Sequence, residues 1–245
     1  MKVPSRMDPQ PLLDVSVRFT FHSSLDGPSE LLQWTRVLSS LFNQMDIGFA
    51  SPLTDDESVE QGPVGVMRFF DDTYDVSISG NNVIVRTTAD YPGWDSMAAL
   101  LNKIIKKASN EYKDRYTINR ISARYLNYFT SSPQMKDIVD IGVDVPKSVD
   151  VGRHSIRLAS GPSEKTRIMH DVTVADSISI NQSDVEGVIL DIGAWKQVEV
   201  NLGSTGDLLK EIDLLHRYEK RLFTSLIKSE ILHAITKEWE DIEDG

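Results

Sequence analysis

The chain has 245 residues, of which 37 are acidic and 26 are basic, so its formal net charge is −11 at pH 7. It contains no cysteine, which excludes a disulfide scaffold, thiolate zinc ligands and a thiol nucleophile. We find no secretory leader and no run of about 18 apolar residues, so we expect a cytoplasmic protein without a membrane segment. The acidic charge repels phosphate backbones, which disfavours general nucleic-acid binding, and it is compatible with a basic protein partner.

The first half of the chain predicts strands and helices in alternation. Residues 1–10 are expected to be unstructured, and apolar and polar residues then alternate from Leu13 to Phe21 as in a half-buried strand. The next expected elements are a helix from an N-cap at Ser29 to Met45, a loop over 48–63, strands at 64–70, 74–79 and 83–88, a helix over 95–109 and a strand over 117–129.

The second half is richer in strands and closes on a long helical pattern. Strands are expected at 139–145 and 184–195, and Gly161-Pro162 predicts a hairpin between 153–160 and 167–175. From Asp207 to Trp239 apolar residues recur every three or four positions, which predicts one long amphipathic helix that is mostly buried on one side.

This order of elements favours an α+β fold with a mostly antiparallel sheet, because short turns join consecutive strands. We expect two similar halves, 11–130 and 134–240, with helices packed on one face and a long C-terminal helix. A single curved sheet that grips the C-terminal helix is the rival arrangement, and it would leave a cavity between sheet and helix.

No fingerprint of catalysis or cofactor binding is present. The glycines match neither phosphate-binding motif, and no serine lies in a G-x-S-x-G elbow. Asp213 and His216 are spaced to face one ligand, but no second His-Asp pair completes a metal site. We therefore predict no catalytic residues, no cofactor and no metal. Asp71, Asp72 and Asp75 are interpreted as turn formers, and His170 as a partly buried strand histidine.

One stretch of this acidic chain is basic. Its candidate residues are Lys103, Lys106, Lys107, Lys113, Arg115, Arg120 and Arg124, with Tyr112, Tyr116 and Tyr125 interleaved. Basic residues beside aromatic ones can bind RNA through phosphate contacts and base stacking. The structural alternative is a lysine-rich outer helix face followed by a strand with arginines on its solvated side.

Four segments together resemble a sporadically distributed prokaryotic family of about this length for which no activity is established. These segments are a Pro-apolar start at Pro11, the element Tyr91-Pro92-Gly93-Trp94, the strand Ala123-Arg124-Tyr125-Leu126-Asn127, and the last helix with Asp213, His216, Phe223 and Trp239. The resemblance covers almost the whole chain and implies an accessory protein of a defence, toxin–antitoxin or mobile-element system. The candidate functional or anchoring residues are Trp94, Arg124, Asn127, Asp213 and His216.

These shared residues also have structural explanations. Asn127 would hydrogen-bond inside the sheet, His216 would anchor the last helix, and Phe223 and Trp239 would belong to the core. A His216 that is buried and bonded to backbone would favour anchoring over a place in a cavity.

Our leading hypothesis is a non-catalytic, cytoplasmic protein-interaction protein, antitoxin-like or immunity-like, and we leave a homodimer open. The first alternative is a small-ligand or nucleotide binder with a sheet–helix cavity. The second alternative is an RNA-acting enzyme that uses the basic stretch 103–124.

Overall fold

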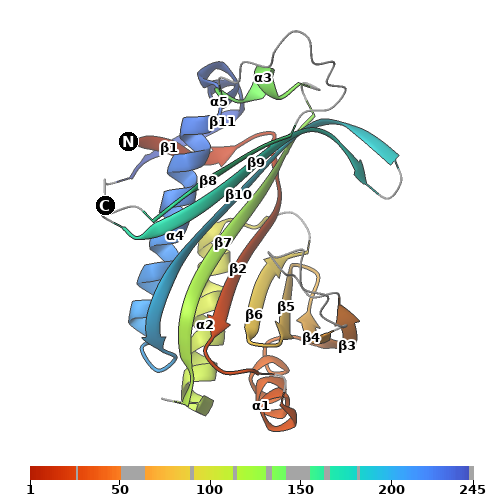
Figure 1. Ribbon diagram of the computed structural model, residues 1–245, viewed down its shortest axis with the longest axis vertical. Helices are drawn as coiled ribbons and strands as arrows, with labels where there is room; N and C mark the ends of the chain where they lie inside the picture. Colours follow the sequence, from red (N-terminus) through yellow and green to blue (C-terminus); the bar gives the residue numbers. More distant parts are fainter. Residues whose placement is uncertain are drawn as a thin grey trace. The chain divides into compact units, whose positions relative to one another are not determined.

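The computed structural model describes residues 1–25, 27–50, 64–88, 91–112, 115–130, 134–141, 155–162, 166–180 and 183–242. Its elements are, in chain order, β1 (Lys2–Met7), β2 (Leu12–Phe21), α1 (Pro28–Leu38), β3 (Gln44–Ala50), β4 (Val64–Phe70), β5 (Tyr74–Ser79), β6 (Asn82–Thr87), α2 (Trp94–Tyr112), β7 (Thr117–Phe129), α3 (Met135–Ile138), β8 (Ser155–Ser160), β9 (Ile168–Ile180), β10 (Ser183–Asn201), α4 (Thr205–Leu226), α5 (Ser229–Ile235) and β11 (Thr236–Asp241) (Figure 1).

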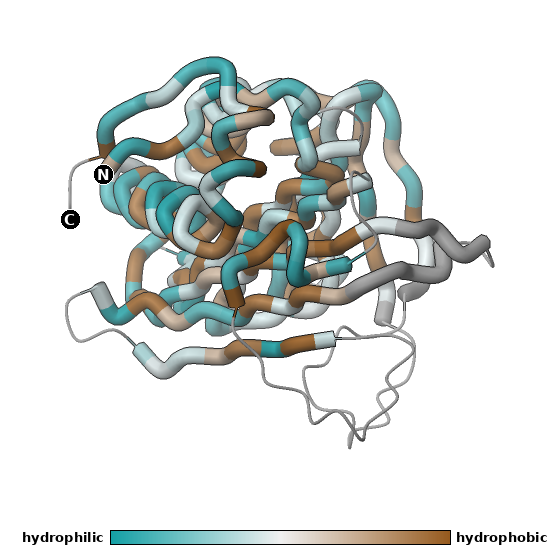
Figure 2. Tube along the Cα trace, turned by 90° about the horizontal axis from the view of Figure 1, so that it is seen from above, coloured by the Kyte–Doolittle hydropathy of each residue, from teal (hydrophilic) through white to brown (hydrophobic). Residues whose placement is uncertain are grey.

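The fold is α+β with antiparallel strand pairing and a long C-terminal helix, α4, which confirms the predicted class. In the part of the chain that the structure describes, nine strands are hydrogen-bonded in the order β3-β4-β5-β6-β2-β7-β10-β9-β8, and β1 pairs with β11 in a separate two-stranded sheet. Along the strands, hydrophobic residues alternate with hydrophilic ones (Figure 2), as expected when only one face of a sheet is buried. None of the helices among the described residues is long and apolar enough to cross a membrane.

The chain forms two compact units that interleave along the sequence. Unit 1 consists of Met1–Val15, Ala123–Lys196 and Leu214–Gly245, and unit 2 consists of Ser16–Ser122 and Gln197–Asp213. Strands β2, β7 and β10 and helix α4 each contribute a segment to both units. The sequence analysis expected two halves that are each one continuous segment, 11–130 and 134–240. The similarity of these two halves stays a prediction.

The core of unit 1 is aliphatic and aromatic. It joins buried residues of β7, β9 and β10 to the second half of α4 and to the short helices α3 and α5. Phe129 of β7 and Phe223 of α4 stack with ring centroids 6.4 Å apart. Phe223 is therefore a core residue, as expected.

The core of unit 2 contains a cluster of aromatic rings. Trp34 of α1 lies edge-on to Phe21 of β2 at 6.2 Å and is tilted against Tyr112 of α2 at 5.2 Å. Tyr116 contacts both Phe21 and Tyr112. Such edge-to-face pairs are favoured by the aromatic quadrupole, and they fix α1 and α2 against β2.

Several local predictions match the structure closely. Strands β4, β5 and β7 have the predicted bounds, and β6 and α2 differ from them by a few residues. Asp71 accepts hydrogen bonds from the backbone amides of Thr73 and Tyr74, both at 2.8 Å, so it is a turn former as interpreted. Asp75 is different, because it is buried on β5 and forms ion pairs with Arg68 and Arg86.

The two ends of the chain differ from the prediction. Residues 1–10 are not unstructured, because β1 pairs with β11 in the register Lys2 with Asp241 and Pro4 with Trp239. The long helix stops at Leu226, and Trp239 lies in β11 with 37% of its surface exposed, so its assignment to a helix and to the core was wrong. Strand pairing with β1 outweighs the local helical periodicity of this segment.

The first predicted helix was also too long. Helix α1 begins at Pro28 with Gly27 as its N-cap, so Ser29 is not the cap, and it ends at Leu38. Met45 lies in β3, where it is exposed. Of the predicted strand 139–145, Val139 forms a bridge with Ile227 and residues 142–145 lie outside the described residues.

Candidate functional site

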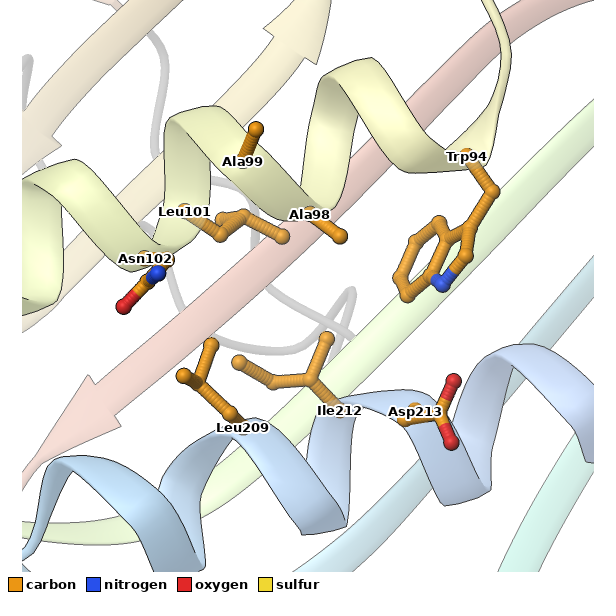
Figure 3. A pocket seen from close by; sticks show the side chains of 8 residues that line it. All are labelled: Trp94, Ala98, Ala99, Leu101, Asn102, Leu209, Ile212 and Asp213. Atoms are coloured by element: carbon orange, nitrogen blue, oxygen red, sulfur yellow. The ribbon is translucent and has the colours of Figure 1, made fainter.

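A cavity of about 340 Å³ lies in unit 2, between α2 and the first half of α4. Both helices are amphipathic, and their buried stripes include Leu101 on α2 and Leu208 and Ile212 on α4. The residues that line the cavity are Trp94, Ala98, Ala99, Leu101, Asn102, Leu209, Ile212 and Asp213 (Figure 3). The cavity is possible because the alanines on α2 leave room that larger side chains would fill.

The polar groups of this cavity lie near its two ends. Figure 3 shows the Trp94 indole beside the first turn of α2, on the side toward Asp213 of α4, whereas Asn102 lies two turns further along α2, near Leu209. Gly93, with a φ of 97°, turns the chain into α2 directly before Trp94, a conformation that favours glycine. Two of the five candidate residues, Trp94 and Asp213, are thereby brought to one cavity.

Asn102 was not among the sequence candidates. Its side-chain oxygen Oδ1 is buried and accepts no hydrogen bond within the described part of the chain. A buried acceptor without a partner costs about 1–3 kcal/mol, so it is normally satisfied by protein, water or ligand. Its spacing could have identified it in the sequence. Trp94, Ala98 and Asn102 follow one another at intervals of four residues, which places all three on the same face of α2.

His216 does not line this cavity, although it follows Asp213 by less than one helical turn. It belongs to unit 1, where it is 5% exposed and its Nδ1 lies 2.5 Å from the hydroxyl oxygen of Tyr125 on β7. Burial, with smaller contributions from Lys220 and Arg217, lowers the pKa of His216 to about 3. The imidazole is therefore neutral at pH 7, and the hydrogen bond between its Nδ1 and the Tyr125 hydroxyl links β7 to α4.

His216 meets one of the two features expected of an anchoring residue. The residue is buried, as anchoring requires, but the hydrogen-bond partner is a side chain rather than the expected backbone group. The two rings also stack, with centroids 5.8 Å apart. His216 thus fastens α4 to the sheet through Tyr125.

Asn127 lies on the same face of β7 as Tyr125 and is 2% exposed. Its Nδ2 donates a hydrogen bond to the carbonyl oxygen of Leu190 on β10 at 3.3 Å. This is the bond inside the sheet that the sequence analysis expected.

Arg124 points to the opposite face of β7, where 55% of its side chain is exposed. Its guanidinium donates two hydrogen bonds to Asp191 of β10, at 2.8 Å and 2.6 Å. A bidentate ion pair of this kind positions β7 against β10. Arg124 therefore lies on the other face of β7 from Asn127 and from Tyr125, the partner of His216.

Glu219 is the buried charge-bearing residue that the sequence analysis missed. It lies on α4 in unit 1, is 2% exposed, and neither carboxyl oxygen has a hydrogen bond of normal geometry within the described residues. Burial raises the pKa of Glu219 well above its usual value, and Asp191 adds to this, whereas the Ala194 backbone amide opposes it. The sequence signal that could have revealed it is its spacing, because Glu219 lies four residues from both Leu215 and Phe223 and therefore on the apolar stripe of α4.

The basic candidates are spread over several environments. Lys103, Lys106 and Lys107 are exposed on α2, Arg115 pairs with Glu30, Arg120 is half-buried on β7, and Lys113 lies outside the described residues. All three interleaved tyrosines are buried, at 4%, 4% and 9% exposure, so they offer no surface for base stacking. The RNA-acting alternative stays a prediction that rests on the three lysines of α2.

One serine contacts a histidine in the strand-rich part of unit 1. The Ser160 hydroxyl on β8 and the Tyr218 hydroxyl on α4 both lie within hydrogen-bond distance of His170 Nδ1, at 2.8 Å and 2.7 Å. Burial lowers the pKa of His170, which is half-buried as interpreted, and the neighbouring Asp171 opposes the shift. The cluster therefore connects β8, β9 and α4, and the Asp171 carboxylate beside its histidine accepts a hydrogen bond from Arg157.

Within the described residues, no group of three or more His, Asp or Glu side chains is arranged to hold a metal ion. A comparison with known protein families finds none that matches the chain, and a comparison with curated proteins finds none that is similar to it.

Proposed function

We propose that this chain is a cytoplasmic small-molecule binder whose ligand occupies the cavity between α2 and the first half of α4. The observation that carries the proposal is the cavity itself, which is mostly apolar and has a small number of polar groups near its ends. Ligand sites have this composition, because apolar walls supply affinity and a few polar groups fix orientation. A volume of about 340 Å³ is at the small end of the usual range of about 300–1,000 Å³.

The position of the cavity supports the same proposal. Its walls are two helices rather than loops. Regular backbone hydrogen bonds therefore fix the main chain that carries the lining side chains. Asn102 and Asp213 add a polar side chain from each of the two helices.

Ligand-observed NMR with a chemically mixed fragment library tests the proposal. We expect some fragments to bind the wild-type chain and to lose binding in Ala98→Phe, which fills the cavity. Ala234→Phe is the matched control, because Ala234 is an exposed alanine on α5 outside the cavity. The proposal fails if no fragment binds, or if Ala98→Phe folds normally and retains every interaction.

A second candidate function is the protein-interaction role of an accessory prokaryotic system, antitoxin-like or immunity-like, in the family that the chain resembles. Strand β3 stands at the end of the strand order, with Met45 and Ile47 exposed by 51% and 66% and the acidic Asp46 between them. An exposed apolar edge strand of an acidic chain suits a basic partner that adds a strand to the sheet.

Co-purification from the native host tests this second candidate. Ile47→Lys is expected to abolish recovery of a defined, basic partner, because it places a charge in the added-strand contact. Leu32→Lys is the control, since Leu32 is an apolar residue on α1 that is 56% exposed, against 66% for Ile47. Equal recovery with both variants would contradict a role for β3.

A further inference from the structure

We propose that the outer face of α2 docks a short acidic segment of a partner protein. This face carries Lys103, Lys106 and Lys107, and we call these three residues the lysine face. None of them lines the cavity between α2 and α4, so the inference goes beyond the proposed function and does not depend on it. It follows from the unpaired charge of the lysine face, from its small extent and from the acidic charge of the whole chain.

The three charges of the lysine face have no counter-ion in the described structure. Each lysine is exposed, and none of them forms a hydrogen bond or an ion pair with the described part of the chain. Glu111 follows Lys107 by one helical turn and is exposed as well, but these two side chains form no ion pair there. The lysine face is therefore a patch of unpaired positive charge on α2.

The positions of these lysines do not stabilise the helix itself. Lys103 precedes Lys106 by three residues and Lys107 by four, so like charges are neighbours on one side of α2, and such pairs destabilise a helix. Lysines stabilise a helix near its C-terminus, but α2 ends at Tyr112 and its last turn contains no basic residue. The buried stripe of α2 consists of other residues. A partner that neutralises the lysine face relieves the repulsion within it.

The extent of the lysine face suits a short segment with several carboxylates. Lys103 and Lys107 are four residues apart on α2, which is about 6 Å along an α-helix. Alternate residues of an extended chain lie on one side at a spacing of roughly 6.6 Å, and residues four apart on a partner helix lie about 6 Å apart. Two or three acidic side chains at either spacing would therefore meet the lysines, whose ammonium groups act as flexible point charges.

A nucleic acid fits the lysine face less well than an acidic peptide does. The chain has a formal net charge of −11, so a polyanion that extends beyond the three lysines is repelled by the rest of the protein. Tyr112 and Tyr116, which follow the lysines in the sequence, are buried and offer no platform for base stacking. Lysine also lacks the planar fork with which arginine binds a phosphate group through two hydrogen bonds. These features favour the carboxylates of a short segment over a phosphate backbone.

A titration with the peptide hexaglutamate, followed by ¹⁵N-correlated NMR, tests the proposal with a defined probe. In the wild-type chain we expect saturable shifts of the α2 backbone amides around the lysine face. Hexaglutamine, which has the same length without the charge, is expected to cause none. Added salt is expected to weaken the binding of hexaglutamate, because salt screens exposed charges. A short oligouridine RNA is the nucleic-acid comparison.

Replacement of the whole lysine face by glutamine locates the effect. We expect this variant to bind hexaglutamate about tenfold more weakly, because each exposed ion pair contributes a modest part of the affinity. Glutamine has nearly the helix propensity of lysine, so α2 is preserved. The matched control replaces three exposed lysines outside α2 and changes the net charge equally; they are Lys2, Lys136 and Lys237. This control is expected to bind like the wild-type chain.

Several results would overturn the proposal. If hexaglutamate does not bind at millimolar concentration, or binds the lysine-face variant as tightly as wild type, this surface does not dock acidic segments. Tighter binding of the RNA than of hexaglutamate would assign the lysine face to nucleic acid. Self-association in analytical ultracentrifugation that is lost in the lysine-face variant would make a second copy of the chain the occupant. The comparison of hexaglutamate with hexaglutamine and RNA uses the wild-type chain, so it remains decisive even if a variant fails to fold.

Discussion

At the scale of single residues, two buried titratable groups on α4 give the stability of the fold opposite dependences on pH. His216 has a pKa lowered to about 3, and Glu219 has a pKa raised well above its usual value. Each group is held in its neutral form by burial, and each costs stability at the pH where the unfolded chain prefers the charged form.

For His216, the unfolded chain binds a proton below about pH 6.5 while the folded chain does not until about pH 3. Stability is therefore lost as the pH falls through this window, by up to about 1.4 kcal/mol per pH unit and about 5 kcal/mol in total. We expect His216→Phe to flatten this acid-side loss in urea unfolding curves recorded from pH 7 to pH 4. His22→Phe, at an exposed histidine, should leave the slope unchanged. Equal slopes for His216→Phe and wild type would contradict the neutral, buried imidazole.

For Glu219, the folded chain keeps its proton at a pH where the unfolded chain has lost it, since its folded pKa is raised. Stability therefore falls as the pH rises above about 4.5, by up to about 1.4 kcal/mol per pH unit. Glu219→Gln cannot ionise, so we expect its stability advantage over wild type to grow from pH 5 to pH 7. Glu230→Gln, at an exposed glutamate on α5, is the control. A constant difference between Glu219→Gln and wild type across this range would count against the raised pKa.

These residues also show where sequence reasoning stopped. Asn102 and Glu219 are polar residues on the inward sides of amphipathic helices, and a periodicity argument treats such positions as apolar or overlooks them. Trp94 was a candidate through a resemblance and Asp213 also through its spacing to His216, but nothing local showed that Trp94 and Asp213, more than 100 positions apart, share a cavity. Spatial proximity of this kind depends on the packing of α2 against α4.

At the scale of elements, prediction succeeded where the signals are local. Strands β4 to β6 were predicted because alternation and turn residues lie within the segment itself, and β7 for the same reason. Strands β1 and β11 were missed because each is defined by a partner at the other end of the chain. Residues 236–241 show this most clearly, since Trp239 continues the helical spacing of the preceding residues but lies in β11.

Strand β10 provides a test of close packing between elements. A Cβ atom at Gly187 would lie 2.3 Å from a ring carbon of Tyr128 and 2.8 Å from the carbonyl oxygen of Phe129. We expect Gly187→Ala to destabilise the chain by about 1–3 kcal/mol, because the ring and backbone of β7 must move. On the same strand, a Cβ at Gly193 would contact only the Asp171 carbonyl oxygen, at 3.9 Å, so Gly193→Ala is the control. Equal free energies of unfolding for the two variants would contradict this packing.

At the scale of the whole molecule, the two compact units share three strands and one helix. Because β2, β7, β10 and α4 each run through both units, neither unit is a continuous piece of chain that can be cut out. We expect one cooperative unfolding transition, with equal calorimetric and van't Hoff enthalpies in differential scanning calorimetry. Two resolved transitions would show that the units unfold independently.

The central claim is that the cavity between α2 and the first half of α4 binds a small molecule, and the tryptophan indole signals test it most directly. The chain has four tryptophans, at positions 34, 94, 195 and 239, so each indole N–H gives its own signal in a ¹⁵N-correlated NMR spectrum. In a titration with a fragment that binds the wild-type chain we predict a saturable shift of the Trp94 signal, while the other three stay in place and serve as internal controls. A Trp94 signal that stays in place at a saturating fragment concentration, or moves no more than the other three, would contradict the account.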